Sequence, residues 1–540
     1  MLQIEINQIV SFFNRKIRWW FPLITGFFFS LCFPPFNADS HWLLFPFPFL
    51  SFGILLPLLG LSVQKPLKRA VFHCYLYSYA LSIGQYYWLI FDNVEGVWHL
   101  IILGLLLGSA VMGLIFLAAA LLFRITYKHF PRLYIFLFPS IWVLIDYFRT
   151  LGDLAFPWSF LGYSLTSVLP LSQRASVTGV WGLTYLILFG NMLLWDLGVT
   201  CFNKEVTARN WVYTGLFSCF LIAVSIWGTI RMNHPPVSST VKISVLQGNL
   251  DQISVGNNSL DTAFSVLGSQ MLAISAEKPD LIISSESSIL SFVARRADHS
   301  HIVRNLVNSA GAPLIFGSLH WDKGPSGSPY EYLVYNTAFL AEPGRFDFSF
   351  YHKIKLVPFS EAIPFEVQFP ILSRINLGEA DFQRGKEFTV FNVGKTIKAA
   401  TLICYEAIFP EFVQQFAKKD ANLLVMLTND GWFGRSTGPY THAEMARMRA
   451  IENGIPIARS ANSGVSMFVD AYGRIDGKTG LYERTTVTRA IHPVNLKTFY
   501  SRWGNWVVKL CLIMLIGSCL WLIIKNAKRM KPCRLHSGNR

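Results

Sequence analysis

Glu286, Lys353 and Cys404 are the residues whose types and positions could support nucleophilic chemistry. They follow the hydrophobic runs of three segments, PDLIISSES, FYHKIKLVPFSE and AATLICYEAIF. Polar side chains at the ends of neighbouring strands can converge, and a thiol beside a suitable base can become a nucleophile. Taken singly, each residue also has an ordinary structural explanation. Glu286 could be a helix cap or part of a surface turn, Lys353 could lie on a solvated strand face, and Cys404 could be a buried core cysteine.

The three residues lie in a stretch of ordinary polar composition, residues 231–500, that we interpret as one domain. Helical patterns fill residues 259–276, 297–310, 411–419 and 440–453. β-Rich runs alternate with them and cover Lys242–Leu246, Leu281–Ser284, Leu314–Leu319, Ala399–Ile403, Leu423–Leu427 and Val465–Asp470. Strands that alternate with helices predict a layered α/β domain.

Apolar runs flank this domain, and a membrane span needs about 20 mostly apolar residues. Eight runs approach that length: 19–36, 42–61, 70–91, 96–123, 133–148, 175–197, 211–230 and 505–524. The sequence therefore predicts a membrane domain of about seven helices over residues 1–230. Residues 501–540 are predicted to hold the last transmembrane helix and a basic tail.

The charge pattern indicates how these spans are oriented. The chain has 47 Lys and Arg against 32 Asp and Glu, a net charge of +15. Seventeen of the basic residues lie in five segments on one side of the predicted spans, and the short loops on the other side hold two. The positive-inside rule predicts that both termini are cytoplasmic and that residues 231–500 lie on the outer side. The charge is thus no signal for nucleic acid, which we do not expect as a partner.

Composition and motifs exclude several other classes. A hydrophobic content of 52% excludes an intrinsically disordered chain, and eight Cys in 540 residues are too few for a disulfide scaffold. Cys404 is the only Cys in the outer domain, so an internal disulfide there is excluded. No GxGxxG, P-loop or CxxC pair appears. His442 and Glu444 lack the HExxH spacing and are interpreted as a solvated helix face, and we expect no metal and no cofactor.

At Glu286, Lys353 and Cys404 the sequence resembles the nitrilase superfamily, whose hydrolases and acyltransferases use a Glu-Lys-Cys triad. The order and the separations of 67 and 51 residues match. Within that superfamily the chain resembles the apolipoprotein N-acyltransferases, which combine several membrane spans with one outward nitrilase-like domain. The segments that carry this resemblance are residues 142–149, 156–164, 351–364, 403–411 and 427–473.

Asp146 stands where the family usually has a Glu, and Ser360 where it usually has a Gly before Glu361. The sequence also departs from this family at two further places. Ser284 and Ser285 precede Glu286 where the family usually has Trp-Pro. No Trp follows the QGN segment 247–249, where the family commonly carries one. None of these departures removes a member of the triad.

The resemblance implies an αββα sandwich for the outer domain and a monomeric, multi-pass protein of the bacterial inner membrane. Its periplasmic domain would transfer an acyl chain from a phospholipid to the N-terminal amine of a diacylated apolipoprotein. Cys404 would accept the chain as a thioester, and Glu286 would act as the base. Lys353 and the backbone N–H after Cys404 would donate to the oxyanion.

The resemblance also implies active-site positions for Glu361, Tyr405 and Glu406, which would position or hydrogen-bond to the triad. For Tyr405 and Glu406, core packing and a structural ion pair remain alternatives. Lys355 would share the face of Lys353 on a strand. The family pattern Tyr-x-Lys-x-x-Leu fits Lys353, so we favour that lysine.

Two apolar segments near these motifs, Ile363–Ile371 and Gly431–Gly434, are interpreted as mobile loops that touch lipid and cover the site. Ordinary core aromatics are the alternative.

Two other functions remain open. A membrane-tethered nitrilase-like amidohydrolase would pass the acyl group to water. A transporter with an accessory domain would need ionisable residues in mid-span, whereas Asp146, Arg149 and Asp196 lie near predicted span ends.

Overall fold

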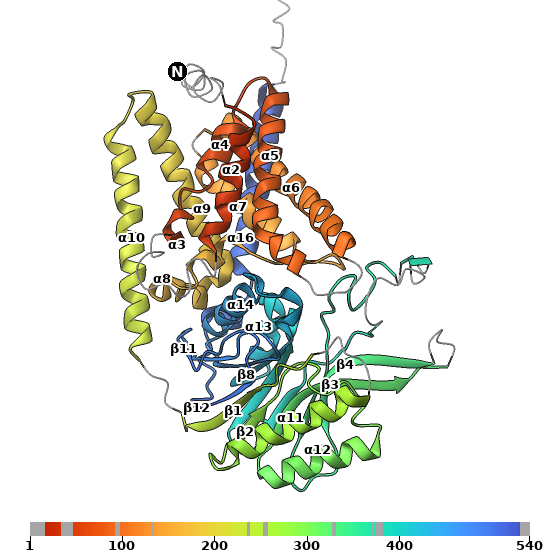
Figure 1. The fold of residues 1–540 in the computed structure, drawn as a ribbon. Coiled ribbons are helices and arrows are strands. Elements are labelled where there is room, and N and C mark those ends of the chain that lie inside the picture. Colours follow the sequence, from red (N-terminus) through yellow and green to blue (C-terminus); the bar gives the residue numbers. More distant parts are fainter. Residues whose placement is uncertain are drawn as a thin grey trace, which may run out of the picture.

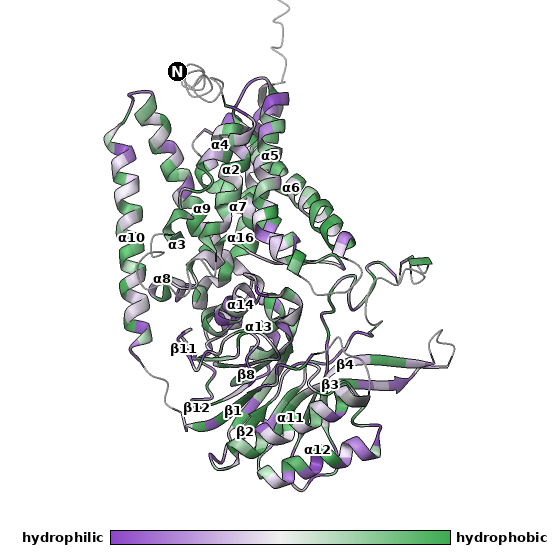
Figure 2. Cartoon of the chain, viewed as in Figure 1, coloured by the Kyte–Doolittle hydropathy of each residue, from purple (hydrophilic) through white to green (hydrophobic). Residues whose placement is uncertain are grey.

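The computed structural model describes residues 17–33, 47–91, 98–131, 133–234, 238–251, 257–326, 331–366, 368–369, 371–372 and 382–529. These residues form a helical part and an α/β part that lie end to end (Figure 1). Hydrophobic residues dominate the helices of the first part, whereas the α/β part is mixed (Figure 2).

The helical part is built from the N-terminal half of the chain and one C-terminal helix. Its elements are α2 (Trp20–Phe27), η1 (Phe28–Cys32), α3 (Phe47–Leu50), α4 (Leu56–Ser62), α5 (Leu67–Tyr86), η2 (Tyr87–Phe91), α6 (Trp98–His129), α7 (Tyr134–Phe148), η3 (Leu161–Leu165), α8 (Leu169–Ser172), α9 (Ala175–Phe202), α10 (Ala208–Met232) and α16 (Trp506–Arg529). The apolar run of α16 therefore returns to the helices formed by the first half of the chain.

Within the described ranges, four helices are long and apolar enough to cross a membrane, namely α6, α9, α10 and residues Trp506–Ala527 of α16. The other predicted runs form shorter or more polar helices within the described residues, and some lie partly outside them. Predicted runs 19–36 and 133–148 form the shorter apolar helices Trp20–Cys32 and Tyr134–Phe148. The part of run 42–61 that is described divides into α3 and α4, and Pro57 lies in the first turn of α4 because it has no N–H to continue a preceding helix.

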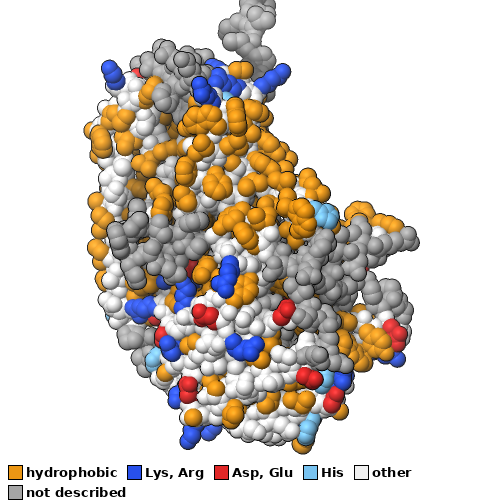
Figure 3. All heavy atoms as spheres, in the orientation of Figure 1, with side chains coloured by type: hydrophobic (Ala, Val, Ile, Leu, Met, Phe, Trp, Pro, Cys, Tyr) orange, Lys and Arg blue, Asp and Glu red, His pale blue; other side chains and the backbone are white. Residues whose placement is uncertain are grey.

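Helix α5 has the length of a span but buries polar side chains inside the bundle. His73, for example, is buried and its Nδ1 lies 2.8 Å from Gln64 Oε1. Such a pair satisfies its own hydrogen bonds away from lipid, so α5 can be more polar than its neighbours. Hydrophobic side chains dominate the described part of the visible face of the helical part, and Lys and Arg gather at its top, near the end marked N in Figure 1 (Figure 3).

The α/β part contains two six-stranded sheets. Their strands are β1 (Val241–Gln247), β2 (Leu281–Ile283), β3 (Leu314–Lys323), β4 (Tyr332–Ala341), β5 (Ser349–His352), β6 (Val390–Val393), β7 (Ile397–Ile403), β8 (Leu423–Thr428), β9 (Ile457–Ala461), β10 (Met467–Val469), β11 (Ile475–Asp476) and β12 (Thr485–Ile491). The sheet orders are β12-β1-β2-β3-β4-β5 and β11-β10-β9-β8-β7-β6. In each sheet the three central strands run parallel.

Helices cover both outer faces of the paired sheets. They are α11 (Asn257–Ser275), α12 (Ala297–Ala310), α13 (Pro410–Lys418) and α14 (Gly438–Asn453). Apolar residues of α11 and α12 form one core with β1–β4. Helices α13 and α14 lie between the other sheet and the membrane helices (Figure 1). The α/β part is therefore the αββα sandwich that the resemblance implied.

Two contacts fix the sandwich against the helical part. Glu452 of α14 accepts a hydrogen bond of 2.7 Å from the backbone N–H of Val180 in α9. Just before it, Gly179 has φ +65°, and a Cβ there would lie 2.5 Å from the ring of Tyr500. Glycine is required at this kink because both the backbone angle and the aromatic contact exclude a larger residue. Tyr500 belongs to α15 (Phe499–Trp503), the short helix that leads into α16.

Candidate active site

Three strands from the two sheets bring the predicted residues together. Glu286 follows β2, Lys353 follows β5 and Cys404 follows β7. Strands β2 and β5 belong to one sheet and β7 to the other, so the cluster lies between the layers of the sandwich. Side chains separated by long stretches of sequence thereby become neighbours.

The turn that carries Glu286 packs directly on the next strand. Gly317 of β3 donates its N–H to the carbonyl of Ser285 at 3.1 Å. A Cβ at Gly317 would lie 2.7 Å from Glu286 Cα, so only glycine allows this approach. The buried Ser284 and Ser285 occupy this tight turn.

Lys353 is fully enclosed beside two carboxylates. Its Nζ lies 3.2 Å from Glu286 Oε1 and 2.7 Å from Glu361 Oε1. Burial alone lowers the pKa of Lys353, but Glu286 and Glu361 overcome that penalty and raise it above the ordinary value. The side chain is therefore a permanent cation within this cluster.

Asn336 of β4 forms hydrogen bonds to both carboxylates. It was not among the site residues expected from the sequence. Its Nδ2 donates to Glu286 Oε1 at 2.9 Å and to Glu361 Oε1 at 3.0 Å. The backbone N–H of Asn429 donates to the other oxygen of Glu286, and that of Val357 to the other oxygen of Glu361. The sequence did hold one signal for this residue, namely the amide of Asn336 within the apolar run YNTAFLA, because a buried polar side chain needs hydrogen-bond partners.

Cys404 occupies a strained turn at the end of β7. Its φ is +48°, a left-handed angle that non-glycine residues adopt at a cost of about 1–3 kcal/mol. Burial raises the pKa of the thiol, Glu286 raises it further, and Lys353 lowers it. The balance is upward, so Cys404 is a protonated thiol at neutral pH and needs a base before it can attack.

A buried polar network holds the backbone of Cys404. His442 Nε2 lies 3.2 Å from the carbonyl oxygen of Cys404, and its Nδ1 lies 2.9 Å from Asp430 Oδ1. Arg459 donates to the second oxygen of Asp430 at 2.7 Å. Burial would raise the pKa of Asp430, but Arg459 and His442 bring it well below its ordinary value.

This network corrects the interpretation of His442 and Glu444 as a solvated helix face. Both are buried, because α14 lies between the sheet and the membrane helices rather than at the surface. Glu444 forms an ion pair of 3.0 Å with Arg447. Sequence periodicity could not show this, since both faces of α14 are covered by other parts of the chain.

Glu406 and Tyr405 form hydrogen bonds to the segments around Cys404. Glu406 Oε1 accepts hydrogen bonds of 2.7 Å from both Tyr351 Oη and the backbone N–H of Ile354, and Oε2 accepts from Ile403 N–H. It thereby ties the Lys353 segment to the Cys404 turn. Burial raises the pKa of Glu406 to about 7 despite these donors. Tyr405 donates its hydroxyl hydrogen to the carbonyl of Ala155 in the helical part.

Lys355, the rival lysine, lies outside the cluster. Strand β5 ends at His352, so the expected strand face shared by Lys353 and Lys355 does not exist. Lys355 Nζ instead lies 5.0 Å from the centre of the Phe409 ring.

The site lies next to the membrane helices. Phe433 of the Gly431–Gly434 segment packs its ring 4.7 Å from that of Trp88 and 6.0 Å from that of Trp158. Phe365 and Phe369 are 40% and 61% exposed, so these two are not core aromatics. Residues 367 and 370 of the segment Ile363–Ile371 lie outside the described residues.

Comparison with known families defines the class first. The Carbon-nitrogen hydrolase family model matches residues 272–499, which include all three triad candidates. Together with the sandwich and the apolar helices, this makes the chain a membrane protein with a nitrilase-superfamily domain. A second model, Apolipoprotein N-acyltransferase N-terminal domain, matches residues 25–193.

Whole-chain relatives identify the family within that class. A protein named Apolipoprotein N-acyltransferase from Rhodopseudomonas palustris is 30% identical over 530 residues, covering 92% of this chain and 93% of its own length. Those from Geobacter metallireducens and Haemophilus influenzae are 31% and 28% identical, covering 69% and 97% of this chain and 71% and 99% of their own. The chain belongs to the apolipoprotein N-acyltransferase family.

Two solved structures are similar to about half of the chain. An amidase from Nesterenkonia sp. AN1 is 19% identical and covers 50% of this chain and 98% of its own, with a TM-score of 0.36. Saccharomyces cerevisiae Nit3 is 17% identical and covers 50% and 97%, with a TM-score of 0.37.

Proposed function

We propose that the protein transfers an acyl chain from a phospholipid to the N-terminal amine of a diacylglyceryl-cysteine apolipoprotein, through a thioester on Cys404. The observation that carries this proposal is the contact between Lys353 and Glu286, both of which interact electrostatically with the Cys404 thiol. The name of the family supports the apolipoprotein as acceptor, and the phospholipid donor is part of the proposal.

In the first half-reaction, Glu286 takes the proton of the Cys404 thiol, and the sulfur attacks the ester carbonyl of the phospholipid. The carbonyl oxygen becomes an oxyanion, to which Lys353 Nζ and the backbone N–H of Tyr405 donate. The first N–H groups of a helix have no partner within it, and η5 (Cys404–Ile408) begins at the nucleophile. The ester C–O bond then breaks, and Glu286 returns its proton to the lysophospholipid oxygen.

In the second half-reaction, the amine of the apolipoprotein attacks the thioester carbonyl. Glu286 takes a proton from the amine, the C–S bond breaks and the sulfur leaves as a thiolate that recovers that proton. Glu361 holds Lys353 between the two carboxylates. Glu406 holds the Lys353 segment against the Cys404 turn, and Tyr405 holds that turn against the helical part.

We also propose the arrangement in the membrane. Residues 1–230 form the membrane domain, residues 231–500 the periplasmic catalytic domain, and residues 501–540 the last span and a basic cytoplasmic tail. Both termini are cytoplasmic and the protein acts as a monomer in the bacterial inner membrane. The contact of Phe433 with Trp88 and Trp158 supports a site close to the lipid surface.

Product analysis tests this proposal. The purified protein in phospholipid vesicles should convert a diacylated lipopeptide with a free N-terminus to the N-acyl form, and Cys404→Ser should abolish this. Cys201→Ser, at an exposed cysteine far from the site in sequence, is the matched control and should leave the rate unchanged. Release of free fatty acid with no N-acyl peptide would instead establish the amidohydrolase alternative. Full activity of Cys404→Ser would overturn the assignment.

A further inference from the structure

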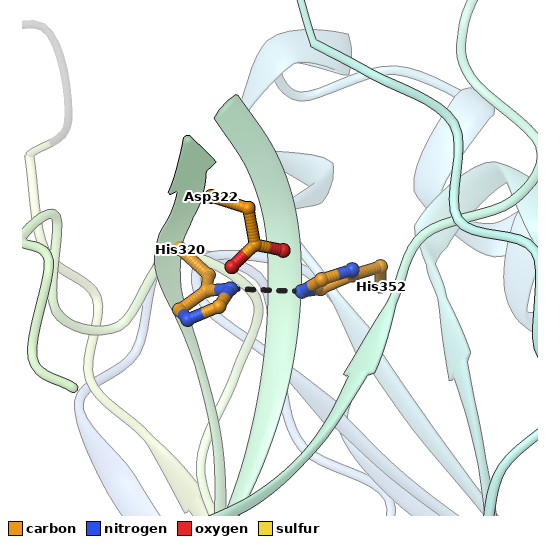
Figure 4. Close-up of side chains that lie close together, drawn as sticks. All are labelled: His320, Asp322 and His352. Carbon is orange, nitrogen blue, oxygen red and sulfur yellow. Dashed lines mark hydrogen bonds between the residues drawn. The ribbon is translucent and has the colours of Figure 1, made fainter. Parts of the chain in front are cut away.

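Three potential metal ligands lie together at one edge of the sandwich, outside the site described above. They are His320 and Asp322 of β3 and His352, the last residue of β5 (Figure 4). One ligand atom from each lies within 4.8 Å of the others. His320 is buried, whereas Asp322 and His352 are half-buried, so solvent can reach the group.

The spacing of the two imidazoles suits a shared metal ion. His320 Nδ1 lies 3.0 Å from His352 Nε2. In a tetrahedral zinc site with Zn–N bonds of 2.0–2.1 Å, the two nitrogens would be roughly 3.3 Å apart. A shift of a few tenths of an ångström would therefore convert the hydrogen-bonded pair into two ligands.

The third ligand, Asp322, and the side chains around the ligands are also placed to bind a metal ion. Arg295 donates to Oδ1 of Asp322 at 2.9 Å, so it orients the carboxylate while Oδ2 remains able to bind a metal. The Tyr335 ring stacks on His352 with 4.0 Å between ring centres and 6° between planes, which fixes the imidazole orientation. Such outer contacts hold metal ligands in their binding geometry.

We propose that His320, Asp322 and His352 bind a divalent transition metal ion, with zinc the best match. Two imidazole nitrogens suit zinc better than magnesium or calcium, zinc also accepts a carboxylate oxygen, and water would occupy the fourth position. The ion would join β3 to the end of β5. Since His352 directly precedes Lys353, the metal would also stabilise the strand end that carries this lysine.

Zinc binding by the full-length protein in detergent, after treatment with a chelator, tests the proposal. Wild type should bind one more zinc ion than His352→Ala at micromolar zinc, and zinc should raise the Tm of wild type only. Cobalt should give a tetrahedral visible spectrum in wild type that is at least ten times weaker in the variant. His301→Ala, at an exposed histidine of α12, is the matched control and should behave as wild type.

Asp322→Asn is the second variant, because it changes a half-exposed side chain and should fold even if His352→Ala does not. It should weaken zinc binding at least tenfold. Equal zinc stoichiometry and Tm shift in wild type and Asp322→Asn, or no zinc bound by wild type, would overturn the proposal. The outcome is independent of acyl transfer, so it does not depend on the function proposed above.

Discussion

Two carboxylates share one ammonium group next to the nucleophile. Glu286 and Glu361 both contact Lys353, so the buried cluster has an excess of negative charge. Burial raises the pKa of the Cys404 thiol, and the negative charge of Glu286 raises it further, so the thiol stays neutral. A protonated nucleophile next to a carboxylate base can be activated during the reaction and stays protected from oxidation at rest.

The Glu286→Gln variant separates two effects of this carboxylate, its action as the base and its influence on the pKa of the Cys404 thiol. Acylation of Cys404 should fall by about 10²–10⁴, because the base is lost. Alkylation of Cys404 by iodoacetamide at a fixed alkaline pH should become faster, because removal of Glu286 lowers the thiol pKa. Glu277→Gln, at an exposed position of the same domain, should change neither rate. Slower alkylation in Glu286→Gln would contradict this electrostatic account.

His442 should contribute through the backbone of Cys404 rather than through substrate. In His442→Ala the carbonyl of Cys404 loses its partner, and we expect kcat to fall at least tenfold with KM unchanged. His442→Gln can still donate from a side-chain amide and should recover part of the rate. Equal kcat in both variants and wild type, in proteins with unchanged Tm, would show that this contact is unimportant.

At the scale of secondary structure, the sequence predicted most of the buried strands and all four covering helices. Runs such as 399–403 and 423–427 are almost entirely apolar because helices or the other sheet cover both of their faces. Strands β4, β5, β6, β9, β11 and β12 escaped prediction. The burial of β4 changes along its length, β5 has only four residues and β12 is half-buried.

The site was predictable where it follows strand ends and family motifs, as for Glu286, Lys353 and Cys404. Contacts that cross the sandwich were not. Asn336 reaches both carboxylates only because β4 lies beside β5, and His442 reaches Cys404 only because α14 covers the end of β7. The metal candidates are similar, since β3 and β5 become neighbours only through β4.

The segment around Phe365 and Phe369 should contact lipid, because it exposes aromatic side chains near the site. Phe365→Ser combined with Phe369→Ser should slow the turnover of phospholipid in vesicles at least fivefold. The same protein should hydrolyse or transfer from a water-soluble short-chain ester at the wild-type rate. Phe346→Ser, at an aromatic side chain that is 81% exposed between β4 and β5, is the control. Unchanged vesicle turnover in the double variant would refute the lipid contact.

At the scale of the whole molecule, the net charge of +15 is what the predicted membrane topology would produce. The five basic segments account for all of it, and the remainder of the chain is balanced. Four helices that can span a bilayer, together with the shorter apolar helices beside them, establish a membrane protein. The positive-inside pattern then predicts which side holds the α/β part.

Labelling of single cysteines in intact spheroplasts tests this orientation. A membrane-impermeant maleimide should react with Lys395→Cys, at an exposed turn of the α/β part, and not with the native Cys201 at the end of α9. Both should react after detergent treatment. Labelling of Cys201 alone in intact spheroplasts would reverse the predicted topology.

The most direct test of the account is the mass of the Cys404 peptide after the protein meets phospholipid without an acceptor. We predict a mass increase equal to one acyl chain, which hydroxylamine removes and which disappears when a lipopeptide amine is added. Glu286→Gln should not accumulate the adduct. A folded wild-type protein that forms N-acyl lipopeptide but never carries an acyl group on Cys404 would contradict the thioester mechanism.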